Sequence, residues 1–112
     1  MATPNTAELN ALANDLATRY ADATLQIREG ATVLATHTLA GFGAASNGTV
    51  TANAIADDTI DATGTADNAK LIDGSTEYGL TLGTSGADVV VSTTNYITGE
   101  TSSVNSLAIT FA

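Results

Sequence analysis

Residues 71–112 read LIDGSTEYGLTLGTSGADVVVSTTNYITGETSSVNSLAITFA, and this stretch decides the fold class. Its short apolar runs are separated by Asp73-Gly74, by the glycine-rich residues 83–86 and by Gly99-Glu100. Asp-Gly between β-favouring runs is a strong hairpin signal, because glycine supplies the positive φ that a tight turn needs. The stretch therefore predicts short strands joined by turns.

Two of these runs indicate how their strands are buried. Residues 89–91 (VVV) form a continuous β-branched run, which is typical of a strand buried on both faces. In the last run, Leu107, Ile109 and Phe111 alternate with smaller residues and so share one face. We expect this last strand to lie inside a sheet.

Similar runs and turn signals continue upstream, among them Glu29-Gly30, where we expect the chain to turn. Alternation predicts that Val33, Ala35, His37 and Leu39 share one face of their strand. A Gly- and Ala-rich loop, residues 40–48, follows and ends on the turn signal Asn47-Gly48. In all, about eight strands are expected, at residues 24–28, 32–39, 49–56, 65–72, 78–82, 89–92, 96–98 and 104–111.

An amphipathic helix is predicted over residues 6–21. Asn5 or Thr6 offers an N-cap, and Glu8 follows Asn5 at the spacing of a capping box. The apolar stripe has helical period and consists of Leu9, Leu12, Ala13, Leu16, Ala17 and Tyr20.

One helix followed by many short strands predicts a mainly β protein. The expected architecture is an antiparallel β-sandwich or small barrel, jelly-roll or immunoglobulin-like, with one N-terminal amphipathic helix. At 112 residues the chain is expected to form a single domain, with residues 1–22 as the helical segment and residues 23–112 as the β-domain.

The composition limits the classes of function. Twelve acids against three bases give a net charge of −9, so a nucleic-acid binder is excluded for want of a basic patch, and binding to an anionic membrane is disfavoured. The absence of cysteine rules out disulfides and thiolate chemistry. A small aliphatic core favours a symmetric homo-oligomer, a trimer rather than a dimer, or tight packing on a lattice of other proteins.

Asp57, Asp58 and Asp61 form the one acidic cluster of the sequence, in the connection DDTIDATG. Carboxylates suit Ca²⁺, which makes these residues weak candidates for a metal site, but EF-hand spacing is missing and a solvated loop is the favoured interpretation. A glycosidase pair would need two carboxylates fixed across a cleft, for which this small Ala- and Thr-rich chain is a poor host.

His37 is the sole histidine, and no G-x-S-x-G elbow accompanies it. We expect a partly buried or strand-edge side chain. The sequence therefore predicts no catalytic residues, no enzyme activity and no cofactor.

The apolar stripe of the helix is the strongest candidate for a contact surface. It packs on the chain's own sheet or docks on a neighbouring subunit, and the first interpretation is favoured. The candidate interface residues are Leu9, Leu12, Leu16 and Tyr20, together with Phe42, the one large residue of the glycine-rich loop.

Several short segments, in this order along the chain, carry a resemblance to a known family. They are residues 24–30 (TLQIREG), 48–55 (GTVTANAI), 62–66 (ATGTA), 72–75 (IDGS) and 83–88 (GTSGAD), followed by Thr110-Phe111. Over residues 24–112 the chain thereby resembles a group of small virion structural proteins of tailed bacteriophages and prophages. Relatives often carry Trp and Phe after the Gly-Thr-Ala step, where this chain has residues 67–70 (DNAK).

The resemblance implies a bacteriophage virion structural protein located in the virion and assembled in the host cytoplasm. A capsid decoration or cement protein that contacts the major capsid protein is the favoured role. The alternatives are a tail or neck adaptor or fibre-associated module and, from a different class, a Ca²⁺-dependent carbohydrate-binding module.

Overall fold

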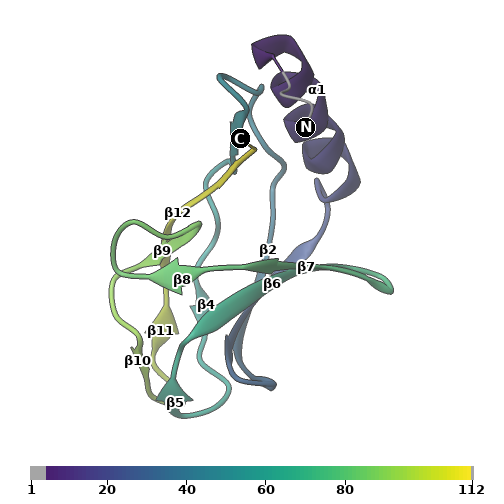
Figure 1. The fold of residues 1–112 in the computed structure, drawn as a ribbon. Helices are drawn as coiled ribbons and strands as arrows, with labels where there is room; N and C mark the ends of the chain where they lie inside the picture. Colours follow the sequence, from purple (N-terminus) through teal and green to yellow (C-terminus); the bar gives the residue numbers. More distant parts are fainter. Residues whose placement is uncertain (1–4, 112) are drawn as a thin grey trace.

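The computed structural model describes residues 5–111, so residues 1–4 of the predicted helical segment and Ala112 lie outside the described part. Strands make up 47% of the structure, and they accompany one helix. Figure 1 shows α1 (Thr6–Arg19) at one end of the molecule and the strands filling the rest. The prediction of a mainly β protein with one helix is confirmed, and no sheet within residues 5–111 closes on itself.

The first sheet is antiparallel throughout and has the order β2-β1-β6-β7. Both of its hairpins turn through two residues, and the first of these is a glycine with positive φ: Gly30 at 57° and Gly74 at 61°. The predicted turns at these positions are confirmed. The strands of this sheet are β1 (Thr24–Glu29), β2 (Thr32–Thr38), β6 (Asn68–Asp73) and β7 (Thr76–Leu80).

The second sheet has the order β3-β12-β9-β8 and contains a parallel pair, β8 with β9, where antiparallel strands were expected. Two small ladders, β5 with β10 and β4 with β11, complete the strands. Their bounds are β3 (Thr49–Thr51), β4 (Asp58–Thr59), β5 (Gly64–Thr65), β8 (Leu82–Gly83), β9 (Val89–Val91), β10 (Asn95–Tyr96), β11 (Thr101–Ser102) and β12 (Val104–Thr110).

The helix begins as predicted and ends two residues early. The Asn5 side chain accepts a hydrogen bond from the Glu8 N–H at 2.9 Å, which satisfies one of the first-turn donors. At the other end Arg19 pairs with Asp15 at 2.9 Å, one turn back. Tyr20 is the C-cap.

Three predicted strands are shorter than expected because the chain changes neighbours within them. The strand predicted at 49–56 ends at Thr51, since Asn53 hydrogen-bonds to the carbonyl oxygens of Ala40 and Gly41 in the preceding loop. The strand predicted at 65–72 divides at residues 66–67, where the chain passes from the β10 ladder to the first sheet.

The third of these strands, predicted at 78–82, divides at Thr81 between the two sheets. The N–H of Thr81 donates to Asp88 and its hydroxyl accepts from the Asp88 N–H, at 3.2 and 3.0 Å. This reciprocal pair closes the loop that carries residues 83–86 and allows Leu82 to join β9 instead of β6.

Two predictions of burial are wrong in part. Val90 is only half-buried, although Val89 and Val91 are in the core. In β2 the pairing shifts by one residue, so that Leu34 bulges and is buried along with Ala35 and His37, while Val33 is half-buried. Simple alternation therefore fails at the bulge.

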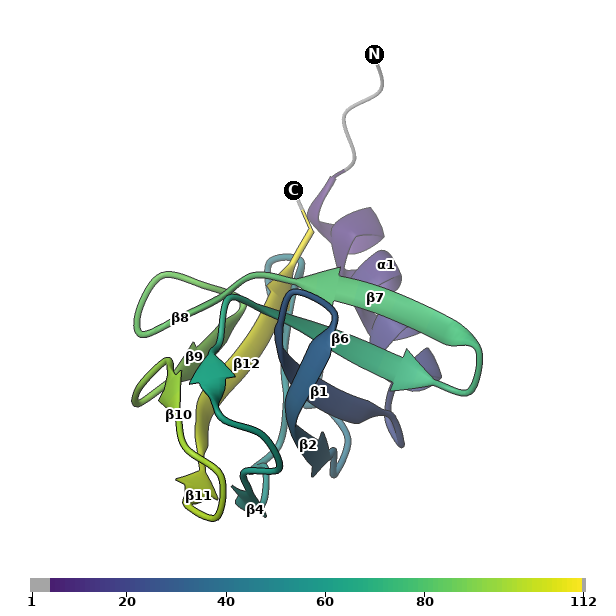
Figure 2. The same cartoon turned by 90° about the horizontal axis from the view of Figure 1, so that it is seen from below.

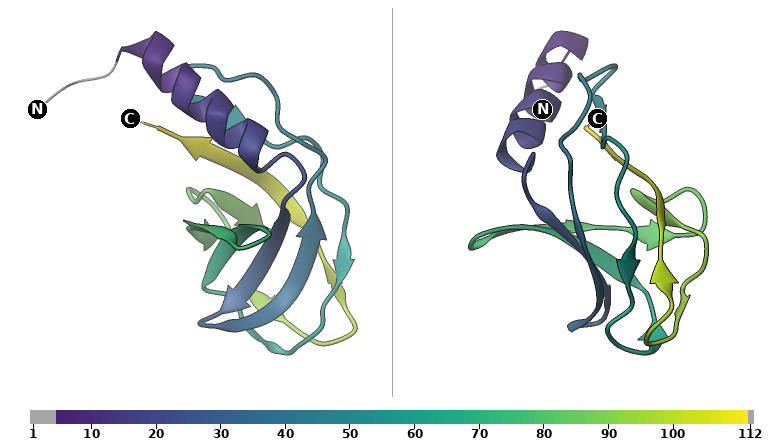
Figure 3. Two further views of the ribbon diagram at one scale, coloured as in Figure 1. Left: turned by 90° about the vertical axis from the view of Figure 1, so that its right-hand side faces the viewer. Right: turned by 180° about the vertical axis from the view of Figure 1, so that it is seen from behind.

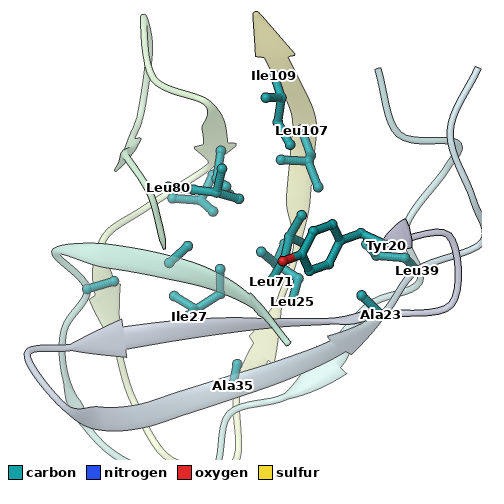
Figure 4. Packing of buried hydrophobic residues seen from close by; sticks show 14 of the residues in the cluster. Tyr20, Ala23, Leu25, Ile27, Ala35, Leu39, Leu71, Leu80, Leu107 and Ile109 are labelled. Atoms are coloured by element: carbon teal, nitrogen blue, oxygen red, sulfur yellow. The ribbon is translucent and has the colours of Figure 1, made fainter. Parts of the chain in front are cut away.

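One core joins the helix and both sheets. Its members include Leu25, Ile27 and Leu71 from the first sheet and Leu107 and Ile109 from β12. Figure 4 shows these side chains converging, with Tyr20 entering from the end of the helix. Leu107 and Ile109 share the buried face of the last strand as predicted.

Candidate functional site

The apolar stripe of α1 divides between the core and the surface. Leu16 and Tyr20 are 6% and 3% exposed and pack within the molecule, whereas Leu12 is 50% exposed. Leu9 is half-buried and lies against Gly48, where a Cβ atom would approach the Leu9 Cβ to 3.0 Å. Of the candidate interface residues on the helix, Leu12 therefore offers the largest apolar surface to a partner.

Leu12 borders a groove of about 170 Å³, which we call the helix groove; apolar and aromatic side chains form most of its lining, and the Asp15–Arg19 ion pair forms the rest. Its walls come from α1, from Tyr78 on β7 and from Phe111 beyond the end of β12. Figure 3 shows β12 running toward the helix, and Phe111, the residue after this strand, lines the groove. The rings of Tyr20 and Tyr78 meet edge to face in the same region, with centroids 6.0 Å apart.

Asn10 and Asn14 fasten the helix to the glycine-rich loop, a role that the sequence reading missed. The Asn10 side chain accepts from the Gly48 N–H at 2.7 Å, and that of Asn14 accepts from the Ala45 N–H at 3.1 Å. Both loop positions lie more than 30 residues away along the chain. Helical periodicity predicts which residues share a face, but it does not identify such distant partners.

Phe42 is half-buried and packs against the core. It forms a bridge with Ala52, and the Gly43 N–H donates to the carbonyl of Thr51 at 2.9 Å. The loop thereby covers the outer edge of β3. Phe42 also lines an open hollow of about 520 Å³ on the side of α1 away from the helix groove, so the candidate interface residues do not form one continuous surface.

The acidic connection covers the outer edge of β2. One carboxylate oxygen of Asp58 accepts from the Thr36 N–H at 3.1 Å, and the Asp61 N–H donates to the Leu34 carbonyl at 2.8 Å. The Asp58 carboxylate is thus engaged with the backbone. No group of three or more His, Asp or Glu side chains placed to hold a metal ion, including Asp57, Asp58 and Asp61, occurs among residues 5–111.

His37 is fully buried, against the expectation of a partly buried or edge side chain. Its Nδ1 lies 2.8 Å from the carbonyl oxygen of Ala56, and its Nε2 lies 2.8 Å from the Ser102 hydroxyl. Ser102 is also buried, and its hydroxyl lies 3.3 Å from that of Tyr96. We call these three side chains the His37 network.

In the His37 network a serine hydroxyl and a histidine nitrogen lie as close together as a catalytic nucleophile and its general base. Both side chains are buried, however, and the other contacts of the histidine differ from those in a catalytic triad. Since a carbonyl oxygen only accepts, Nδ1 carries a proton and donates to Ala56, the place where a triad has a carboxylate. Ser102 is 2% exposed, and the cavity beside it measures about 70 Å³. Burial raises the pKa of the Tyr96 phenol above its ordinary value, while the Ser102 hydrogen bond opposes this shift.

The His37 network joins parts of the chain that sequence reading could not bring together. His37 lies on β2, Ser102 on β11 and Tyr96 on β10, and 65 residues separate the serine from the histidine. Its members satisfy one another's polar atoms inside the core, which rigidifies the packing of these strands.

No helix within residues 5–111 is long and apolar enough to cross a membrane. Comparisons with family models, curated proteins and solved structures found no match for this chain.

Proposed function

We propose that this chain is a structural protein of a tailed-bacteriophage virion and acts as a capsid decoration or cement protein on the major capsid protein. The observation that best supports the proposal is the division of the helix stripe. Leu16 and Tyr20 hold α1 on the chain's own core, while Leu12 stays half exposed beside the helix groove. A cement protein needs such an apolar contact on a rigid support.

The placement of the chemically capable side chains agrees with this proposal. His37 and Ser102 are buried in a network that links strands, and Asp58 is bonded to the edge of β2. These groups support the fold in their present positions. The class of particle is inferred from the succession of short sequence segments within residues 24–112 that resembles phage virion proteins.

The finer architecture that we infer is a β-sandwich. Two four-stranded sheets contribute side chains to one core, and the small β5–β10 and β4–β11 ladders lie beside them. Such a sandwich would present its loops and edges to neighbouring capsomers. We also propose that the chain either associates with itself, for which the composition favours a trimer, or packs on the lattice of coat proteins.

Purified virions of the phage that encodes the chain provide the test. We expect the protein on the capsid surface, and capsids stripped of it should melt at a lower temperature and regain stability when it is added back. Location in the tail or neck would favour the adaptor alternative. Unchanged capsid melting together with absence of the protein from virions would refute the proposal.

Leu12→Asp separates docking from folding. We expect the variant to keep its β-sheet circular dichroism and to lose capsid binding, because Leu12 is half exposed. Ala11→Asp, at an exposed neighbouring position on the same helix, is the matched control and should bind.

Calorimetry with Ca²⁺ and with glycans examines the carbohydrate-binding alternative, for which binding heat is the expected signal.

A further inference from the structure

The outer edge of β7 differs from the other edges of the two main sheets. The acidic connection covers the edge of β2, and the glycine-rich loop covers the edge of β3. The edge strand β8 is only two residues long and offers few backbone groups to a partner. β7 has five residues, is paired along its length with β6, and no backbone hydrogen bond to its outer side is found in the described part of the chain. Figure 2 shows it as the outermost strand of its sheet.

The hairpin geometry identifies the backbone groups that point outward. A two-residue turn closes on a hydrogen-bonded pair, here Asp73 with Thr76, and bonded and non-bonded pairs then alternate. Thr76, Tyr78 and Leu80 therefore bond to β6, and the N–H and C=O groups of Glu77 and Gly79 face away from the sheet. Both residues are exposed. An edge of this kind is a template for another strand.

We propose that β7 is a docking strand for a second copy of this chain, paired antiparallel across a two-fold axis at Tyr78. In this register Glu77 lies opposite Gly79 of the second copy, and Gly79 opposite its Glu77. Each of these two pairs exchanges both hydrogen bonds, so all the outward backbone groups are satisfied. The two Tyr78 side chains become a cross-strand aromatic pair next to the helix groove.

Charge and shape favour a second copy in this register. Lys70, hydrogen-bonded to Glu77 at 2.9 Å, holds the pKa of that carboxyl below its usual value, so Glu77 is charged at neutral pH. Opposite it lies a glycine, around which no atom lies within 4 Å of the Cβ position. An axis centred on Glu77 would instead place two carboxylates face to face, which is unfavourable.

The pairing is an interface of two-fold symmetry, whereas the composition favoured a trimer. It rests on the backbone of β7 and not on the proposed function, so either can fail without the other. A five-residue edge buries little surface, and we expect a weak dimer that forms at high local concentration.

Sedimentation of the full chain up to about 1 mM tests the pairing. We expect a monomer–dimer equilibrium, and Gly79→Glu should weaken it by about tenfold or more, because it places like charges opposite each other twice. The new side chain has room in the monomer and projects beside Lys70, so folding should be unaffected. The charge-swapped double variant Glu77→Lys/Gly79→Glu should restore the dimer.

Hydrogen exchange supplies a second readout in the unmodified protein. The amides of Glu77 and Gly79 should exchange fast when dilute and slow down as the concentration rises, whereas the Tyr78 amide, which bonds to β6, should be protected at both concentrations. A monomer at about 1 mM with both outward amides unprotected would overturn the proposal. So would an oligomer indifferent to Gly79→Glu, or a charge-swapped variant that stays monomeric.

Discussion

Replacing Ser102 with alanine is the sharpest test of the His37 network. The change removes a single oxygen atom from the core and leaves the Nε2 atom of His37, 2.8 Å away, without its partner. A buried polar atom left unpaired costs about 1–3 kcal/mol. The Tyr96 hydroxyl, at 3.3 Å, forms a longer and weaker bond and adds little.

We therefore expect Ser102→Ala to lower the free energy of unfolding by about 2 kcal/mol. For a chain of this length that corresponds to a fall in Tm of about 6–10 °C. The cavity beside Ser102, about 70 Å³, could admit a water molecule to the orphaned nitrogen, and this would bring the loss toward the lower end.

Urea unfolding followed by circular dichroism measures the effect, with the exposed Ser106→Ala in β12 as the matched control, expected within about 0.5 kcal/mol of the wild type. A double-mutant cycle with His37→Phe should give a coupling energy of about 1 kcal/mol or more. If Ser102→Ala behaved like the control, or if the two changes were additive, the network would not contribute to stability as argued.

Three further outcomes are expected. Leu16→Ala should cost about 2–5 kcal/mol in urea unfolding, since its side chain is in the core, while Leu12→Ala should cost far less; equal losses would show that the stripe is not divided. Gly48→Ala should lower Tm through a strain of roughly 1–3 kcal/mol, because φ is +77° and the new Cβ would lie 2.7 Å from a carbonyl oxygen; an unchanged Tm would contradict this geometry. Hydrogen bonds from the Gly30 N–H and from the side-chain amide of Asn68 hold the pKa of Asp67 below its ordinary value of 3.8. The ionised carboxylate therefore stabilises the fold at pH values above 3.8, and this contribution is lost as the pH falls through the lower pKa of the folded state. Asp67→Asn should therefore be less stable than the wild type at pH 7, with a difference that shrinks in acid; a difference independent of pH would refute the role of the charge.

The local features of this fold could be predicted from the sequence. Glycine at a tight turn and an asparagine N-cap act within a few residues, so Gly30 and Gly74 were identified correctly, and Asn5 was one of the two N-cap candidates. Leu107 and Ile109 alternate without a bulge between them, and their shared face was also predicted.

The features that the sequence did not reveal depend on partners far along the chain. The division at Thr81 requires Asp88 to be held against it, and the buried state of His37 requires Ser102, which 65 residues separate from it. The bulge at Leu34 changes which residues face the core without any local glycine to mark it. For the candidate interface, periodicity placed Leu12 and Leu16 on one face of the helix. Only the packing of the helix on the core shows that Leu16 is buried and Leu12 is exposed.

The position of β12 in the middle of the second sheet has a consequence for synthesis on the ribosome. β3 pairs with β12, which begins more than fifty residues after β3 ends. At translation rates of about 5–20 residues per second, β3 waits roughly 3–10 s for its partner. Local contacts of the helix and of the β1–β2 hairpin can form in that interval, whereas the second sheet cannot. Nascent chains would therefore pass through a state in which the core side chains that later pack against Leu107 and Ile109 of β12 are uncovered, and chaperones could bind them in that interval.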